Sequence, residues 1–219
     1  MILLARLILS VISLVALQRP APRDQTTSAA LAYVHRVRPH HVFGRITSAE
    51  LGIYGWRVIE GVDTTRDLDR GPGHYPSTTV PGLGGTVAIA GHRVTPVGGR
   101  PYGPFYYIDR LRRGDRIVLT MPYATFVYRV GRHVVVPASA TWFERYTGRE
   151  RLVLSACTPK FSARSRWVVF ARLVKATPRR RGAARREALR RAEADHAADA
   201  VLGLHQLEAA VDLIQRDVV

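Results

Sequence analysis

The apolar run Leu152-Val153-Leu154-Ser155-Ala156-Cys157 ends on the only cysteine of this 219-residue chain. An arginine pair, Arg164 and Arg166, follows within ten residues, and a second apolar run upstream, Val87-Ala88-Ile89-Ala90-Gly91-His92, ends on a histidine. Short apolar runs bounded by turn residues are typical of buried strands. A lone cysteine, with histidine and arginine at matching strand ends, indicates a thiol nucleophile.

Runs of the same kind extend outward on both sides, from about residue 44 to residue 176. They are rich in Val, Ile, Tyr and Thr and are separated by Gly, Pro and Asp clusters, which is the pattern of many short strands. No long helical period interrupts them, so we do not expect strand–helix–strand units. The sequence therefore predicts an all-β domain over 44–176, built as a closed or half-closed barrel. The predicted strands are Phe43–Ile46, Ile53–Glu60, Thr86–Gly91, Arg116–Thr120, Ala124–Val135, Arg151–Ser155 and Arg166–Val174.

The N-terminal segment is residues 1–18, and within it Ile2 to Leu17 are apolar apart from Arg6, Ser10 and Ser13. It is short for a membrane span, and it reads as a membrane anchor or a signal segment. We favour an uncleaved anchor because no good small-residue cleavage site follows; a buried core helix is the other reading. Residues 19–43 are polar and predict a linker, with a short helix possible over 29–38 and solvated histidines at His40 and His41.

Residues 177–219 form a fourth region. Seven arginines occur within 179–191, and apolar residues then recur at alternating four- and three-residue steps from Ala200 to Val218. This spacing predicts one amphipathic helix over 182–217, outside the barrel. The helix could pack on its own domain, self-associate or lie along an anionic membrane face.

The charge balance is strongly basic, with 33 Lys and Arg against 17 Asp and Glu and a net charge of +16. Such a surface favours anionic partners. No nucleic-acid-binding motif accompanies the charge, so nucleic acid is not an expected partner. A single cysteine excludes an internal disulfide and a cysteine-rich zinc site, and we expect neither a metal nor a cofactor.

The three candidate groups suit acyl transfer. A thiolate at Cys157 could attack a carbonyl, the imidazole of His92 could move the proton, and an arginine could hold the oxyanion. Arginine suits this role because it keeps its charge and offers a rigid fork of donors. No Asp or Asn is apparent as a partner for His92, and histidine precedes cysteine in the chain, which argues against a papain-like protease.

Three motifs, in order, resemble those of the sortase family. They are Pro81–Arg93, which ends in Gly91-His92-Arg93; residues 103–120, with Pro104-Phe105 and Leu111-Arg112-Arg113-Gly114-Asp115; and Leu152 to Arg166, which holds Cys157-Thr158-Pro159. The resemblance covers about residues 44–175. It implies an eight-stranded β-barrel with the site at one end. It also implies cleavage of a C-terminal sorting signal of LPXTG or LAXTG type between Thr and Gly, through a thioester, and transfer to an amine of a peptidoglycan precursor or a pilin.

The resemblance assigns His92 as acid and base, Cys157 as nucleophile and Arg166 as the arginine that opens the last strand, with Arg164 as the other candidate. Arg164, Thr158 and Ala156 are expected on the substrate side. The family's TLXTC motif reads Val153-Leu154-Ser155-Ala156-Cys157 here, so two threonines are replaced by Val and Ala.

The form of the cysteine motif is similar to class E or D sortases. The implied partners are surface proteins with a sorting signal, an amine acceptor and the membrane, with a single-pass anchor and an extracytoplasmic catalytic domain. A second reading remains open: a non-catalytic β-barrel that binds anionic wall polymer or membrane. His74, His133, His196 and His205 are expected to be structural.

Overall fold

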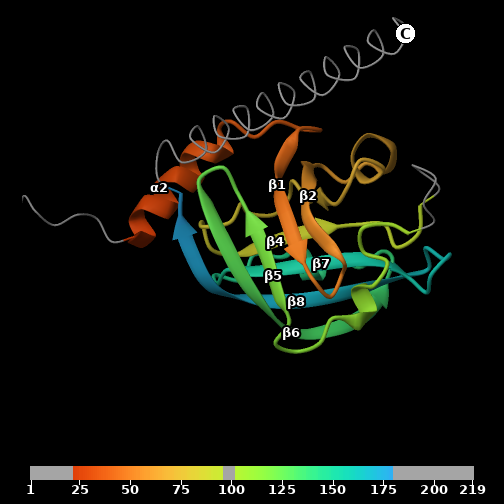
Figure 1. Cartoon of the computed structure of the whole chain (residues 1–219). Coiled ribbons are helices and arrows are strands. Elements are labelled where there is room, and N and C mark those ends of the chain that lie inside the picture. The colour runs from red at the N-terminus through yellow and green to blue at the C-terminus, as the bar shows by residue number, and fades with distance from the viewer. Residues whose placement is uncertain (1–21, 96–101, 180–219) are drawn as a thin grey trace, which may run out of the picture. The chain divides into compact units, whose positions relative to one another are not determined.

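The computed structural model describes residues 22–95 and 102–179, and within them eight strands form one closed barrel (Figure 1). The strands lie in the order β1-β2-β3-β4-β7-β8-β6-β5, and β5 pairs with β1 to close the ring. Their bounds are β1 Val42–Ser48, β2 Ile53–Glu60, β3 Gly73–His74, β4 Thr86–Ala90, β5 Arg116–Thr120, β6 Ala124–Pro137, β7 Arg151–Thr158 and β8 Ser165–Pro178. The predicted closed eight-stranded barrel is confirmed.

The barrel interior is filled by the apolar residues that alternate along the strands. In β5 and β6, the cross-strand pairs Ile117–Tyr128 and Leu119–Phe126 point inward and are fully buried. Strand β7 is buried on both faces, because a second apolar cluster with Phe143 and Phe170 covers its outer side. This double burial explains why the run 152–156 is apolar without alternation.

Two features of the sheet could not be predicted from the sequence pattern. Strand β3 is only two residues long, and it pairs in parallel with β2 and antiparallel with β4. Strands β6, β7 and β8 also run beyond their predicted ends, to Pro137, Thr158 and Pro178. Pairing between neighbours extends these strands past the point where their own composition favours a strand.

Helix α2 (Pro22–Val34) occupies much of the segment that was expected to be a linker. It is longer than the possible helix over 29–38 and begins earlier. Thr26 and Ala30 on this helix are buried, and the Tyr33 hydroxyl donates a hydrogen bond to the Phe43 carbonyl at 2.6 Å. The segment 22–34 is therefore part of the folded domain.

His40 also differs from its expected role as a solvated linker histidine. Its backbone is in the left-handed region, at φ 65°, and its Nδ1 lies 2.8 Å from Oδ1 of the fully buried Asp67. This contact fixes the start of β1 against the connection between β2 and β3.

The described helices include none that is long and apolar enough to cross a bilayer. The expected anchor or signal segment at 1–18 lies outside the described residues. The amphipathic helix expected over 182–217 does so as well.

Candidate active site

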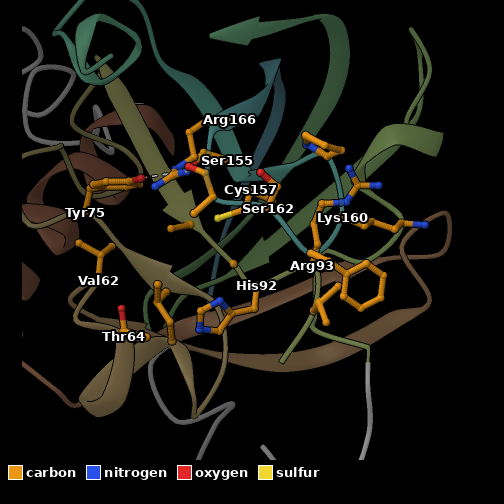
Figure 2. A pocket seen from close by; sticks show the side chains of 18 residues that line it. Val62, Thr64, Tyr75, His92, Arg93, Ser155, Cys157, Lys160, Ser162 and Arg166 are labelled. Atoms are coloured by element: carbon orange, nitrogen blue, oxygen red, sulfur yellow. Dashed lines mark hydrogen bonds between the residues drawn. The ribbon is translucent and has the colours of Figure 1, made fainter. Parts of the chain in front are cut away.

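The parallel pairing of β4 with β7 brings the histidine and the cysteine to the same edge of the sheet. Ala90 is in register with Ser155, and the Gly91 amide donates to the Ser155 carbonyl at 3.0 Å. His92 and Cys157 each follow two residues after that last registered pair. Figure 2 shows the His92 ring and the Cys157 side chain facing the same cavity.

The antiparallel pairing of β7 with β8 adds the arginine. Arg166 is the direct cross-strand partner of Cys157, and residues in such register share one face of the sheet. The Arg166 guanidinium donates to the Ala163 carbonyl at 2.9 Å, which holds the side chain near the start of β8. Arg164 precedes this strand and is exposed, and it is not among the described residues that line the cavity.

The cavity has a volume of about 560 Å³. Its walls come from the segment after β2, the ends of β4 and β7, and the loop 159–163 between β7 and β8. Ala156, expected on the substrate side, is buried and lines it. Thr158 is not among the lining residues, and its hydroxyl accepts instead from Nη1 of Arg93 at 3.3 Å.

A carboxylate that sequence reasoning missed lies beside the histidine. Oδ1 of Asp69 is 3.4 Å from Nε2 of His92, and both side chains are partly exposed. Asp69 ends a single π-helical turn, Thr64–Leu68, and its amide donates to the Thr64 carbonyl at 3.0 Å. No spacing in the sequence links Asp69 to His92, because the contact depends on how the connection between β2 and β3 folds back.

Arg93 is a second residue that the sequence did not single out. Its side chain is 4% exposed, and Nη2 lies 2.6 Å from Oδ2 of Asp109. The same guanidinium donates to the Tyr106 carbonyl at 3.4 Å as well as to Thr158. One buried cation thus joins the ends of β4 and β7 to the segment 102–110, directly behind His92.

Tyr75 and Ser155 form the cavity wall nearest Arg166. The Tyr75 hydroxyl and the Ser155 hydroxyl are 3.1 Å apart, as the dashed line in Figure 2 shows. Burial raises the pKa of Tyr75 above its ordinary value, and the hydrogen bond with Ser155, then the Arg166 charge, offset only part of this effect. Tyr75 is therefore a neutral phenol at neutral pH and a hydrogen-bonding group within the cavity.

The other histidines serve elsewhere. His74 is buried, with Nδ1 2.8 Å from Oε2 of Glu60 and its ring stacked on Phe43. The exposed His133 stacks on Trp167, and His196 and His205 lie outside the described residues. Within residues 22–95 and 102–179, no group of three or more His, Cys, Asp or Glu could hold a metal ion.

The family model and the curated relatives that match this chain all indicate the same protein family. The sortase domain family model matches residues 45–174. The chain is 32% identical to sortase E1 of Streptomyces coelicolor over 141 residues, which is 57% of this chain and 38% of that protein. It is 29% identical to sortase D of Bacillus subtilis over 122 residues, 53% of this chain and 57% of that protein. The chain thus spans between about a third and three fifths of these curated relatives.

Solved structures agree. A crystal structure of Streptomyces coelicolor sortase E1 with a tripeptide in the active site superposes with a TM-score of 0.56 at 29% identity, covering 67% of this chain and 96% of that one. Sortase E of Streptomyces avermitilis gives a TM-score of 0.55 at 29% identity, over 64% and 93% of the two chains. With the family model matching more than half of its length, this chain belongs to the sortase family.

Proposed function

We propose that this protein is a transpeptidase that cleaves a C-terminal sorting signal of LPXTG or LAXTG type and joins the released protein to an amine. The observation that carries the proposal is the meeting of Cys157, His92 and Arg166 at one cavity, delivered by three neighbouring strands. The relatives of class E and class D support the subclass that the cysteine motif suggests.

In the first half-reaction, the Cys157 thiolate attacks the carbonyl carbon of the threonine in the signal. The oxyanion that develops is held by the guanidinium of Arg166, a fixed positive donor. His92, as imidazolium, donates its proton to the glycine nitrogen while the C–N bond breaks. The products are a thioester on Cys157 and a free amine on the departing peptide.

In the second half-reaction, an acceptor amine attacks the thioester carbonyl and His92 takes the proton from its nitrogen. The C–S bond then breaks, the Cys157 thiolate returns and a new amide is formed. The acceptor is proposed to be a peptidoglycan precursor or a pilin lysine. We further propose a membrane-anchored protein whose catalytic domain faces the outside, with the anchor in residues 1–18.

The test uses the full chain, solubilised in detergent, and a fluorogenic sorting-signal peptide. Cys157→Ala should abolish cleavage, and His92→Ala should abolish it while the matched control His133→Ala should not. A thiol-reactive probe should label Cys157 at neutral pH only when His92 is present. Cleavage retained in Cys157→Ala would sink the proposal.

A non-catalytic barrel that binds anionic polymer is the other function consistent with the net charge of +16. It predicts salt-sensitive binding that ignores Cys157, with no cleavage by the wild-type chain. The assembly of a thiol, an imidazole and a guanidinium at one cavity has no explanation under that reading, so we favour the enzyme.

A further inference from the structure

Three arginines lie directly opposite one another on adjacent strands, on the outer surface of the barrel. Arg116 on β5 is in register with Arg129 on β6, and Arg129 is in register with Arg172 on β8. Each is exposed, and the residue next to it, Ile117, Tyr128 or Ala171, is buried. We call Arg116, Arg129 and Arg172 the arginine row; Figure 1 shows β5, β6 and β8, which carry it.

The charges of the arginine row are not compensated by acidic residues. Strands β5, β6, β7 and β8 contain no Asp or Glu, and the ion pairs among the described residues include none of the three arginines. Arg129 donates to the Gly114 carbonyl at 2.7 Å, which leaves its charge unpaired. Like charges directly opposite in a sheet destabilise it, so the row costs stability in the isolated protein.

Other cations extend the same surface. Lys175 on β8 is exposed and in register with Val127, which lies two residues before Arg129 on β6. On the far side, Arg151 of β7 is the register partner of Arg172. The guanidinium groups of Arg132 and Arg151 both lie over the Phe170 ring, 4.6 and 5.2 Å from its centroid. Burial, and next the charge of Arg132, lower the pKa of Arg151 below its ordinary value.

We propose that the arginine row binds a linear, flexible polyanion of the phosphodiester type. Guanidinium groups bind phosphate oxygens through paired, charge-assisted hydrogen bonds, and a phosphodiester chain presents such oxygens at regular intervals. Neighbouring strands lie about 4.8 Å apart, so the three arginines follow a line about 10 Å long across the strands. This line follows the curved wall of the barrel.

The convex wall of the barrel favours a flexible polyanion over a flat or stiff one. A flexible chain can bend along the row and reach all three guanidinium groups, whereas a flat bilayer touches a convex wall over a narrower strip. Duplex DNA is stiff over lengths far larger than this domain. Single-stranded nucleic acid is usually held by exposed aromatic side chains on which its bases stack. Of the outer neighbours of the row, Val118 and Val127 are aliphatic, and Phe170 is buried.

The arginine row is separate from the catalytic cavity. Arg172 lies six residues along β8 from Arg166, and none of the row's members lines the cavity. A polymer bound there would hold the enzyme near an anionic matrix and leave the cavity open to substrate. The inference therefore goes beyond the proposed transpeptidation and does not depend on it.

The test compares two triple variants of the full chain, each of which removes three positive charges. One is Arg116→Gln/Arg129→Gln/Arg172→Gln; the control is Arg36→Gln/Arg57→Gln/Arg66→Gln, at exposed arginines that are not register partners of one another. The probe is a synthetic oligo(glycerol phosphate), with binding measured by fluorescence anisotropy over a salt series. The Arg-rich segment 179–191 is unchanged in both variants, so its contribution cancels.

We expect the row variant to bind the oligomer about tenfold more weakly at physiological salt, and the slope of log affinity against log salt to fall by about 2, from three lost contacts. The control should change neither value by more than about half as much. Urea midpoints no lower than that of the wild type would show that both variants fold, and the midpoint of the row variant should rise because its opposed like charges are gone. Equal losses in the two variants, or a larger row-dependent loss for phosphatidylglycerol vesicles or duplex DNA than for the oligomer, would overturn the proposal.

Discussion

At the scale of single residues, the position of a side chain in the strand register decides whether it reaches the cavity. Arg164 and Arg166 are two residues apart and identical in chemistry, but only Arg166 lies within β8 and opposite Cys157. Because alternation along a strand sends both side chains to one face, the sequence could not choose between them. The register with β7 makes that choice.

Arg166→Ala should therefore lower kcat/KM for the sorting peptide by about 100- to 1,000-fold, the usual effect of removing an oxyanion donor. Arg164→Ala, which removes an equal charge from an exposed site, should stay within about threefold of the wild type. Steady-state cleavage assays of both variants measure the difference. Equal losses would mean that the two arginines act only through their shared positive field.

Asp69→Asn tests the carboxylate beside the histidine. The pair is partly exposed and separated by 3.4 Å, so its contribution should be about 0.2–1 kcal/mol, which corresponds to a fall in kcat of about 1.4- to fivefold. The fall should appear in kcat with KM unchanged, because Asp69 acts on His92 and does not line the cavity. Asp63→Asn, an exposed acid on the same connection, is the control, and a similar fall there would contradict a specific role for Asp69.

At the scale of elements, strand composition predicted the sheet well and the connections poorly. Seven of the strands are marked by their own Val, Ile and Tyr residues, but β3 is a two-residue strand, Gly73–His74, and carries no such signal. Helix α2 was missed as a packed element because its apolar residues do not form one stripe: Leu31 and Val34 are exposed, whereas the residues that face the barrel are Thr26, Ala30 and Tyr33. The partners of Arg93 and His92 were also hidden, since they lie on connections whose path depends on the closed barrel.

Ala30→Lys tests the docking of α2. Ala30 is fully buried, so a lysine there must either bury its charge or detach the helix, at a cost of about 1–3 kcal/mol in the free energy of unfolding. Leu31→Lys, one residue on and 53% exposed, should change stability by less than about 0.5 kcal/mol. Urea denaturation of both variants gives the comparison, and equal midpoints would show that α2 adds nothing to the stability of the barrel.

At the scale of the whole molecule, the two ends of the barrel hold different polar groups: the candidate active site at one end and a buried carboxylate at the other. The cavity lies where β4 and β7 end, and Glu150 lies just before β7 begins. Its carboxylate accepts from the Tyr128 hydroxyl at 2.7 Å and from the Gly82 amide at 2.7 Å. Burial nevertheless dominates these hydrogen bonds and raises the pKa of Glu150 above its ordinary value of 4.5.

The raised pKa of Glu150 predicts a pH dependence of stability. Between pH 4.5 and the higher folded-state value, the folded chain holds a proton that the unfolded chain has released. The free energy of unfolding should then fall as the pH rises through that window. In Glu150→Gln this part of the slope should vanish, as urea titrations at several pH values would show, whereas an unaltered slope would assign the dependence to other groups.

The parallel contact between β4 and β7 has a practical consequence for any assay of this enzyme. The proposed acid and the proposed nucleophile come from opposite halves of the polypeptide, and they are brought together by the pairing of β4 with β7. A partly folded chain that lacks this pairing would not hold the two groups at one cavity and should not turn over substrate. The measured rate therefore also depends on the fraction of molecules that are folded. The rate of a variant has to be divided by this fraction before its loss is attributed to the missing side chain.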